Sequence, residues 1–237
     1  MKNDTCSCGH CQHQLCAKRV PIFSVLDEEE LNRVVGLIIR RHYGKGEMIL
    51  LEGSNLDSLI IINHGRVKAF RYTQEGKEQI LYIFSEGDFF GEKNLLTRQE
   101  ATYNVEALEQ THVCMIHNKD FQELIRRYPD ISLKIITELC SRLDRLERSV
   151  QNMGTKNAEG RIAAVLLEFA EQYGTVHSLG IQFELPFSRE GIANYIGVAR
   201  ETVSRRLNHL QEEGIIEMIG NKKIIIKNKE ALIMEIE

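Results

Sequence analysis

The first half of the chain has the pattern of one helix followed by many short strands. Asp27 followed by Glu30 predicts a helix start, and apolar residues continue at helical spacing to Ile38. From about Tyr43 to Ile116, strand-length apolar runs stand between glycines, and no helix-length segment interrupts them. The predicted strands are Met48–Leu51, Leu59–Ile62, Arg66–Tyr72, Gln79–Phe84 and Val105–Ile116. Such a series predicts an antiparallel β-roll of the jelly-roll type.

A helical pattern resumes at Lys119–Arg127, and Pro129 then opens a long helix. Apolar residues recur along it in alternating three- and four-residue steps, which is the seam of a two-stranded coiled coil. The seam residues are Ile136, Leu139, Leu143, Leu146, Val150 and Met153. The alternative is a helix that packs only on its own domain. Charged residues outside the seam favour a partner helix, and a homodimer is the simplest such partner.

The last third predicts a winged helix-turn-helix. A helix containing Ile162 and Phe169 ends at Gly174, and a short strand then leads to Pro186. Ser188 predicts the cap of a helix that ends at a turn on Gly197. A second helix follows over about 200–212, and two apolar runs around Gly220 read as a hairpin. Helix, tight turn, helix and hairpin are the components of this DNA-binding motif.

The second of these helices separates into two faces. Val203, Leu207 and Leu210 lie at inward spacing, and a polar face opposes them. That polar face contains Glu201, Ser204, Arg205 and Asn208, with Arg200 beside them. Arginine bonds guanine in the major groove, glutamate accepts from cytosine, and serine suits several bases. On an isolated helix, such a polar face is equally well explained as a surface that only contacts water. The flanking helix and hairpin favour DNA recognition.

Composition limits the alternatives. The chain has 237 residues, 30 Lys and Arg against 34 Asp and Glu, and a formal net charge of −4. That balance excludes binding of nucleic acid by bulk positive charge. From residue 156 onward we count ten Lys and Arg against twelve Asp and Glu, so a positive footprint must be local. Its candidate residues are Arg189, Arg200, Arg205, Arg206, Lys222 and Lys223. No segment has the apolar length of a membrane span or signal peptide, so we expect a cytoplasmic protein.

The six cysteines are unevenly placed. Cys6, Cys8, Cys11 and Cys16 lie close together near the N-terminus, whereas Cys114 and Cys140 stand alone. In a cytosolic protein such spacing favours metal or redox chemistry over structural disulfides. Cys140 falls on the long helix, where we expect an ordinary packed thiol.

Several motifs together resemble the CRP/FNR family of bacterial transcription regulators. They are Gly87-Asp-Phe-Phe-Gly-Glu92, Lys156-Asn-Ala-Glu-Gly-Arg161, Ser188-Arg-Glu-Gly-Ile-Ala-Asn-Tyr-Ile-Gly197 and Glu201-x-x-Ser204-Arg205. The resemblance implies an α+β protein with a cyclic-nucleotide-binding-like β-roll, a dimerisation helix and a C-terminal winged helix-turn-helix, and no enzymatic activity. The expected divisions are a cysteine-rich segment at 1–19, a sensor roll at 20–128, a dimerisation helix at 129–155 and a DNA-binding domain at 156–237.

The resemblance also implies the partners. The expected ligand is double-stranded DNA with an inverted repeat, and RNA polymerase is a further expected partner. The Glu-x-x-Ser-Arg pattern is similar to the FNR branch, which reads TTGA-like half-sites. Arg200 looks like the cyclic-AMP receptor branch instead, where an arginine helps to read TGTGA-like half-sites. The DNA-binding residues implied by this carry-over are Ser188, Arg189, Arg200, Glu201, Ser204 and Arg205.

The sensor implied by the resemblance is an iron–sulfur cluster. Cys8, Cys11 and Cys16, with a distant Cys114, resemble the four thiolate ligands of the FNR [4Fe–4S] cluster, and Cys6 is a substitute for Cys8. The cyclic-AMP branch instead binds its ligand through Gly-Glu and a later Arg-Ser or Arg-Thr pair. Gly91 and Glu92 are present, but Ala101-Thr102 stands where the arginine should be. We therefore expect no cyclic nucleotide.

Alternatives remain open at this point. The N-terminal thiols with His10 or His13 have the composition of a zinc site, two thiols suit a reversible disulfide, and the segment also suits a mobile tail. A regulator of the same fold that responds to a small organic effector is another reading. A cupin-like metalloenzyme is a remote one, because the histidines of the predicted roll show no close His-x-His spacing.

Overall fold

The computed structural model describes residues 20–97, 99–155 and 157–236. Internal contacts divide these residues into two compact units. The first unit comprises the described residues within Met1–Arg71 and Leu81–Arg142, and the second comprises those within Tyr72–Ile80 and Leu143–Glu237. Among them, no helix has the length and apolar character needed to cross a membrane.

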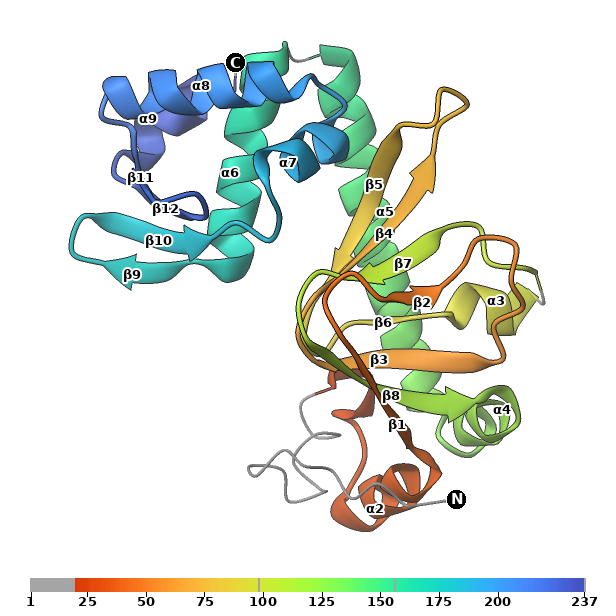
Figure 1. Cartoon of the computed structure of the whole chain (residues 1–237). Coiled ribbons are helices and arrows are strands. Elements are labelled where there is room, and N and C mark those ends of the chain that lie inside the picture. The colour runs from red at the N-terminus through yellow and green to blue at the C-terminus, as the bar shows by residue number, and fades with distance from the viewer. Residues whose placement is uncertain (1–19, 98, 156, 237) are drawn as a thin grey trace. The chain divides into compact units, whose positions relative to one another are not determined.

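The first unit is an antiparallel roll with helices against one of its sheets (Figure 1). One sheet has the strand order β1-β8-β3-β6, and the other has the order β2-β7-β4-β5. The elements are η1 (Pro21–Phe23), α2 (Glu28–Leu37), β1 (Ile39–Tyr43), β2 (Met48–Leu50), β3 (Ser58–His64), β4 (Val67–Tyr72), β5 (Glu78–Phe84), β6 (Phe89–Phe90), α3 (Glu92–Thr97), β7 (Asn104–Ala107), β8 (Thr111–His117) and α4 (Asn118–Arg127). The predicted antiparallel roll is confirmed.

Strand β3 has an uninterrupted apolar run because both of its faces are covered. Ile60 and Ile62 belong to the core formed by side chains from both sheets. Leu59 and Ile61 belong to a second core on the outer face, with side chains from η1, α2, α4 and the following helix. Side chains alternate between the two faces of a strand, so one run supplies both cores.

The structure corrects three details of the sequence prediction. The run Val105–Ile116 is two strands, β7 and β8, separated by a turn. The short helix α3 interrupts the strand series, which the sequence predicted to contain no helix. Strand β1 also begins at Ile39, before the glycine-rich region. Short strands and one-turn helices carry too little periodicity to separate from loops by sequence alone. The predicted helix start is confirmed, because Asp27 and Glu30 cap each other's backbone N–H groups.

Helix α5 runs from Pro129 to Thr155, and its first half is fixed to the roll by a buried arginine. Arg142 Nη1 donates to Glu92 Oε1 over 3.0 Å, and Arg142 Nη2 donates to the Phe89 carbonyl oxygen over 2.6 Å. The guanidinium also lies 4.6 Å from the ring centre of Phe89 and 5.1 Å from that of Phe84. Arg142 and Glu92 side chains are only 8% and 6% exposed, so this ion pair is almost fully withdrawn from water.

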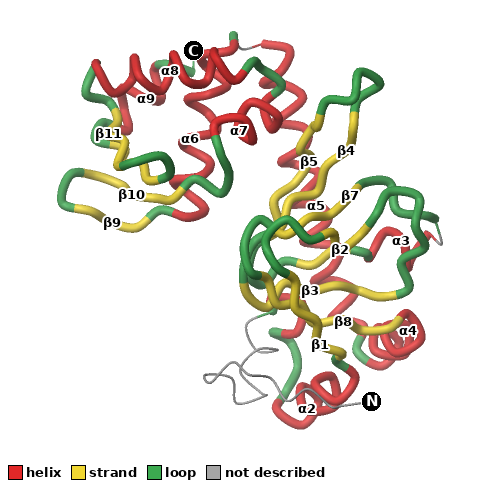
Figure 2. The backbone as a smooth tube through the Cα atoms, viewed as in Figure 1, coloured by secondary structure: helices red, strands yellow, loops and turns green. Residues whose placement is uncertain are grey.

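After α5, the second unit contains four helices and two hairpins (Figure 2). Its sheet has the order β11-β12-β10-β9. The elements after α5 are α6 (Ala158–Tyr173), β9 (Thr175–His177), β10 (Gly180–Glu184), α7 (Arg189–Ile196), α8 (Arg200–Glu212), β11 (Ile216–Ile219), β12 (Lys223–Ile226) and α9 (Lys229–Met234). The predicted winged helix-turn-helix is confirmed, with β9 as a strand that the sequence did not predict.

Removing one partner of the buried pair should destabilise the roll. Arg142→Met leaves the buried Glu92 without its counter-charge, and we expect the free energy of unfolding to fall by about 3 kcal/mol. The double variant Arg142→Met/Glu92→Gln should be more stable than Arg142→Met, because no isolated charge remains. Urea denaturation of the three proteins gives these values.

The matched control is Arg71→Met, which makes the same side-chain change in the exposed Arg71–Glu52 pair. We expect a loss below about 1 kcal/mol there. Equal losses of unfolding free energy in Arg71→Met and Arg142→Met would show that the buried pair stabilises the roll no more than an exposed pair does.

Candidate nucleic-acid interface and thiol site

Helices α7 and α8 are joined by a tight turn whose geometry the sequence dictates. The Ser188 hydroxyl accepts from the Gly191 N–H over 3.3 Å and caps α7. Gly197 ends α7 with φ 69° and ψ 45°, in the left-handed region that favours glycine. Helix α8 therefore restarts at Arg200 in a new direction, with its first turn free of a side-chain cap.

Helix α8 has the two faces that the sequence predicts. Val203, Leu207 and Leu210 are at most 1% exposed, so the prediction that they pack inward is confirmed. On the opposite face, Ser204 is half-buried, and the remaining members of the predicted set are exposed. Those exposed residues are Arg200, Glu201, Arg205 and Asn208. One helix thus presents two guanidinium groups, a carboxylate and an amide on a single surface.

Arg206 does not belong to that surface, which corrects its assignment to the positive footprint. It is 6% exposed and pairs with Glu235 of the C-terminal segment and, over 3.4 Å, with Glu159 of α6. Its position three residues after Val203 and four before Leu210 places it on the buried side of α8. The sequence does not reveal this role, because both acidic partners lie far away along the chain. Arg206 therefore fixes α8 within its domain.

The hairpin of β11 and β12 is connected directly to α8 and α7. Gln211 of α8 accepts from the Met218 N–H of β11 over 2.9 Å. Arg189 of α7 places its Nη2 3.6 Å from the Met218 sulfur and is half-buried there. At the tip of the hairpin, Lys222 and Lys223 are exposed. The two helices and the hairpin therefore form one surface element, with positive charge at the hairpin tip and on the exposed face of α8.

Cys114 lies in the outer core of the roll. Its residue is 6% exposed and belongs to the same buried cluster as Val20, Ile22 and Phe23. In β8 it stands directly between Arg40 of β1 and Ile61 of β3. A small cavity at this place is lined by Arg40, Arg41, His42, Asn63, His112, Val113 and Cys114. Burial in this cluster places the thiol where the first described residues of the chain pack against the sheet.

The other predicted cluster ligands, Cys8, Cys11 and Cys16, and the substitute Cys6, lie outside the described residues. Within residues 20–97, 99–155 and 157–236, no group of three or more His, Cys, Asp or Glu side chains has the geometry of a metal site. Cys140 is exposed, not packed as the sequence predicted. The described part of the chain thus offers Cys114 as the buried thiol.

The seam residues of α5 do not all face the same way. Ile136 and Leu143 are each 54% exposed, and Leu146 is 37% exposed. Leu139, in contrast, is half-buried against the outer core of the roll. Leu133 and Cys140 join the exposed side instead. The side chains of Val150 and Met153 lie outside the described residues. The exposed apolar strip is therefore Leu133, Ile136, Cys140 and Leu143, followed by Leu146 near its edge.

Glu92, the acidic residue of the Gly-Glu pair, is already engaged by Arg142. Burial raises the pKa of the Glu92 carboxyl, and the Arg142 guanidinium opposes that rise. Burial also raises the pKa of the Tyr103 hydroxyl, with the Glu92 charge adding to the effect. Gly91 has a φ of 95°, and a Cβ there would lie 2.7 Å from the Ser58 carbonyl oxygen. Glycine at this position lets the chain bring Glu92 into the interior.

Two family models match the chain. A cyclic nucleotide-binding domain matches residues 40–128, and a Crp-like helix-turn-helix domain matches residues 160–234. A protein of Lacticaseibacillus casei named as a probable transcriptional regulator, flp, is 32% identical over 91% of this chain and 95% of its own. The fumarate and nitrate reduction regulatory protein of Yersinia pestis is 31% identical over 94% of this chain and 88% of its own. The structure of FixK2 from Bradyrhizobium japonicum aligns with a TM-score of 0.73 at 26% identity, over 82% and 95% of the two chains.

Adjacent arginines on α8 should have opposite effects. Arg205→Ala should weaken binding to an operator by about 1–3 kcal/mol and relax base preference, with unchanged stability, because Arg205 is exposed. Arg206→Ala should instead lower the free energy of unfolding, because it leaves the acidic groups near α8 unpaired. Fluorescence anisotropy with operator and random DNA, together with thermal unfolding, measures both effects. Equal losses on both DNAs from Arg205→Ala would show that Arg205 contacts only phosphate.

Proposed function

The chain belongs to the CRP/FNR family of DNA-binding transcription regulators, and on that premise we propose that it is an oxygen- or redox-responsive member. In this proposal a [4Fe–4S] cluster held by Cys8, Cys11, Cys16 and Cys114 controls operator binding by a homodimer in the cytoplasm. Cys6 is the substitute for Cys8. The cluster supplies the oxygen sensitivity, since its loss removes a brace between the N-terminal segment and the roll.

The observation that carries the proposal is the burial of Cys114 in the same core as Val20. A chain spans at most about 3.5 Å per residue, so the four steps from Val20 to Cys16 reach about 14 Å. The outer core that contains Cys114 is therefore within reach of the N-terminal cysteines. A zinc site made only of N-terminal Cys and His would have no use for a thiol in this core.

A cationic residue stands beside Cys114 in the sheet. Arg40 is its direct cross-strand neighbour and lines the same small cavity. A guanidinium next to a cluster site offsets part of the negative charge that four thiolate ligands bring. The residues present in the roll therefore fit the group, with Cys114 as one ligand and Arg40 as its electrostatic support.

A cyclic nucleotide is a poorer candidate for the signal. Arg142 already engages Glu92 within the roll. The pair Ala101-Thr102 provides no arginine for a cyclic phosphate, and Ala101 itself is only 4% exposed. A bound cyclic phosphate would need a charge-assisted partner at that place. These observations support a signal that enters elsewhere.

The arrangement of α8 supports recognition of an inverted-repeat operator. Glu201, Ser204 and Arg205 lie on the face away from the domain core, with Arg200 at the first turn. Ser188 and Arg189 begin α7, where a helix start and a guanidinium suit contacts to the phosphate backbone. The half-sites are TTGA-like or TGTGA-like, according to whether Glu201 and Arg205 or Arg200 sets the outer bases. RNA polymerase is the further partner.

A homodimer explains the exposed strip on α5. Leu133, Ile136 and Leu143 are 54–61% exposed in a single chain. Apolar side chains in three- and four-residue steps are covered when a second copy of the helix lies alongside. Two copies related by a two-fold axis present two recognition helices to the two halves of an inverted repeat. The dimer is therefore the DNA-binding form in this proposal.

The proposed function is tested by purifying the full chain without oxygen. We expect absorbance at about 400 nm from the cluster. We also expect about four irons and four sulfides per chain, because a [4Fe–4S] cluster has that composition. Zinc in place of iron, or an iron-free protein that binds its operator and responds to thiol oxidants, would overturn the cluster assignment.

Cys114→Ser should abolish cluster assembly and leave the roll folded. The thiolate is the ligand, and a serine of similar size fits the same buried position with a small loss of stability. Iron analysis and circular dichroism of the anaerobically purified variant measure the two outcomes. Cys140→Ser is the matched control, because Cys140 is exposed on α5, and its iron content should be unchanged. Full iron content in Cys114→Ser would show that the fourth ligand is a residue other than Cys114.

Oxidation should cross-link two copies of the chain through Cys140. In a parallel, in-register seam the two Cys140 residues face each other, and Cα atoms at a seam position lie within the roughly 4.4–6.8 Å that a disulfide requires. A mild oxidant applied to a variant lacking the four N-terminal cysteines should give a covalent dimer on a non-reducing gel. The same variant with Cys140→Ser should stay monomeric on the gel. Absence of a cross-link in the first variant would contradict an in-register seam at this position.

A further inference from the structure

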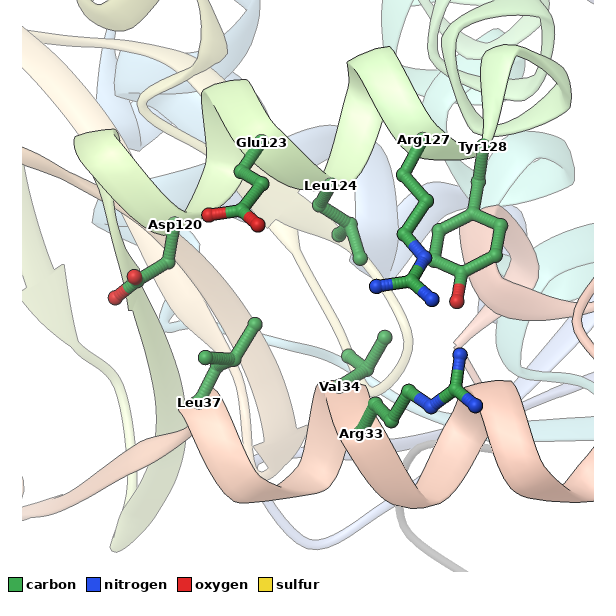
Figure 3. A pocket seen from close by; sticks show the side chains of 8 residues that line it. All are labelled: Arg33, Val34, Leu37, Asp120, Glu123, Leu124, Arg127 and Tyr128. Atoms are coloured by element: carbon green, nitrogen blue, oxygen red, sulfur yellow. The ribbon is translucent and has the colours of Figure 1, made fainter.

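Two cavities in the first unit differ in chemistry. One, of about 260 Å³, lies between α2 and α4 (Figure 3). Within the described residues, its lining includes no histidine or cysteine, and its polar groups are those of arginine, aspartate, glutamate and tyrosine side chains. The other is the small cavity at Cys114, which His42 and His112 also line. The proposed function uses Arg40 and Cys114 there and gives the histidines no role, although imidazole is a common ligand of transition-metal ions.

Three histidines form one row across three neighbouring strands. His42 of β1 is directly opposite His112 of β8, and His112 is directly opposite His64 of β3. The ring centres of His42 and His112 are 4.4 Å apart, and those of His112 and His64 are 5.7 Å apart. His42 and His64 are exposed, and His112 is half-buried. An ion from solvent therefore reaches the row without opening the core.

Charge pairing does not explain this row. Elsewhere in the roll, Lys68 of β4 is directly opposite Glu106 of β7, and the two side chains form an ion pair at 3.3 Å. Opposite charges at such positions stabilise a pair of strands, whereas like charges destabilise it. Imidazole opposite imidazole provides no ion pair, and two protonated rings would repel each other. A cation shared by neutral rings would instead hold the strands together.

The separations between the rings suit a shared ion. Zn²⁺ lies about 2.0–2.1 Å from a coordinating imidazole nitrogen, and therefore about 3.2 Å from the ring centre. Two rings that bind one ion at an angle of about 90–120° then have their centres about 4.5–5.5 Å apart. The measured separations of 4.4 and 5.7 Å are close to the two ends of this range. The strands thus already hold the rings at nearly the spacing that chelation requires.

Binding requires rotation of side chains but no change of the strands. The rings of His42 and His112 meet edge to face at 89°, and the described side chains do not converge on one point. His42 is exposed, so its side chain can turn toward an ion by changing rotamer. At the other end of the row, Glu86 Oε2 lies 3.8 Å from Nδ1 of His64. A carboxylate beside one ring nitrogen orients the other nitrogen for a metal.

We propose that His42, His64 and His112 together bind one divalent transition-metal ion, with Zn²⁺ as the ion to be tested. Three imidazole nitrogens and one water make up the four ligands that Zn²⁺ prefers. Ni²⁺ and Cu²⁺ also suit imidazole, whereas Mg²⁺ takes oxygen ligands. No cysteine takes part, so the site is separate from the proposed cluster and does not depend on it.

A bound ion would tie three strands together close to Cys114. His112 is two residues before Cys114 on β8, and His42 is two residues after Arg40 on β1, which is about 7 Å along each strand. An ion that binds the folded chain stabilises it by mass action. Metal binding would therefore act on the same face of the sheet as the outer core, as an input independent of the thiols.

The test uses the full chain with its four N-terminal cysteines replaced by serine, so that zinc does not bind to those thiols. Isothermal titration calorimetry should show one Zn²⁺ per chain, and excess Mg²⁺ should not compete. His112→Asn should weaken Zn²⁺ binding at least about tenfold, because it removes the central ring of the row. His42→Asn should also weaken it, and circular dichroism should show a folded chain, because His42 is exposed.

His117→Asn is the matched control, because His117 lies at the other end of β8, outside the row. Its Zn²⁺ affinity should equal that of the parent chain. Nuclear magnetic resonance of the imidazole nitrogens should show that Zn²⁺ shifts the signals of His42, His64 and His112 and leaves that of His117 unchanged. The proposal is overturned if no Zn²⁺ binds, or if His42→Asn and His112→Asn bind it as tightly as the parent chain does.

Iron content separates this site from the proposed cluster. His42→Asn in the chain with all its cysteines, purified without oxygen, should contain as much iron as the unmodified chain. A fall in iron would place His42 in the cluster site and would overturn a separate metal site. Iron missing from the unmodified chain, with Zn²⁺ binding at the histidines intact, would overturn the proposed function and support this inference.

Discussion

The ion pair between Arg142 and Glu92 fixes the first half of the long helix to the roll. Arg142 binds the Glu92 carboxylate and the Phe89 carbonyl, and it lies against two aromatic rings, so its position on α5 has little freedom. Because the pair is buried, water does not compete for either partner, and separation would leave isolated charges in the interior. The orientation of α5 about its own axis follows from this contact.

That orientation decides which residues of α5 are left for a second copy. With Arg142 and Leu139 turned toward the roll, Leu133, Ile136, Cys140 and Leu143 are exposed. The same contact occupies Glu92, which would otherwise be available to a ligand inside the roll. In the proposed function the signal acts from the outer face, where Cys114 shares a core with the first described residues of the chain. The Arg142–Glu92 contact thus bears both on which face of α5 is exposed and on whether Glu92 is available to a ligand.

Features with a local cause could be predicted from the sequence. The Asp27–Glu30 capping box and the inward face of α8 depend on residues within one or two turns, and both are confirmed. Predictions failed where a residue's role depends on partners far away along the chain. The sequence suggests that Arg206 is a surface charge, but the structure pairs it with Glu159 and Glu235. The sequence places Leu139 in the seam, but the structure packs it against the roll. Periodicity identifies a helix face but not the surface that it meets.

The proposed function requires that cluster chemistry at Cys114 control DNA binding by α8. The most direct measurement is the operator affinity of one anaerobically purified sample before and after exposure to air, at fixed salt, with iron content followed in parallel. We predict that the operator affinity falls about tenfold or more as the iron–sulfur absorbance is lost. An affinity that stays constant while the cluster disappears would contradict it.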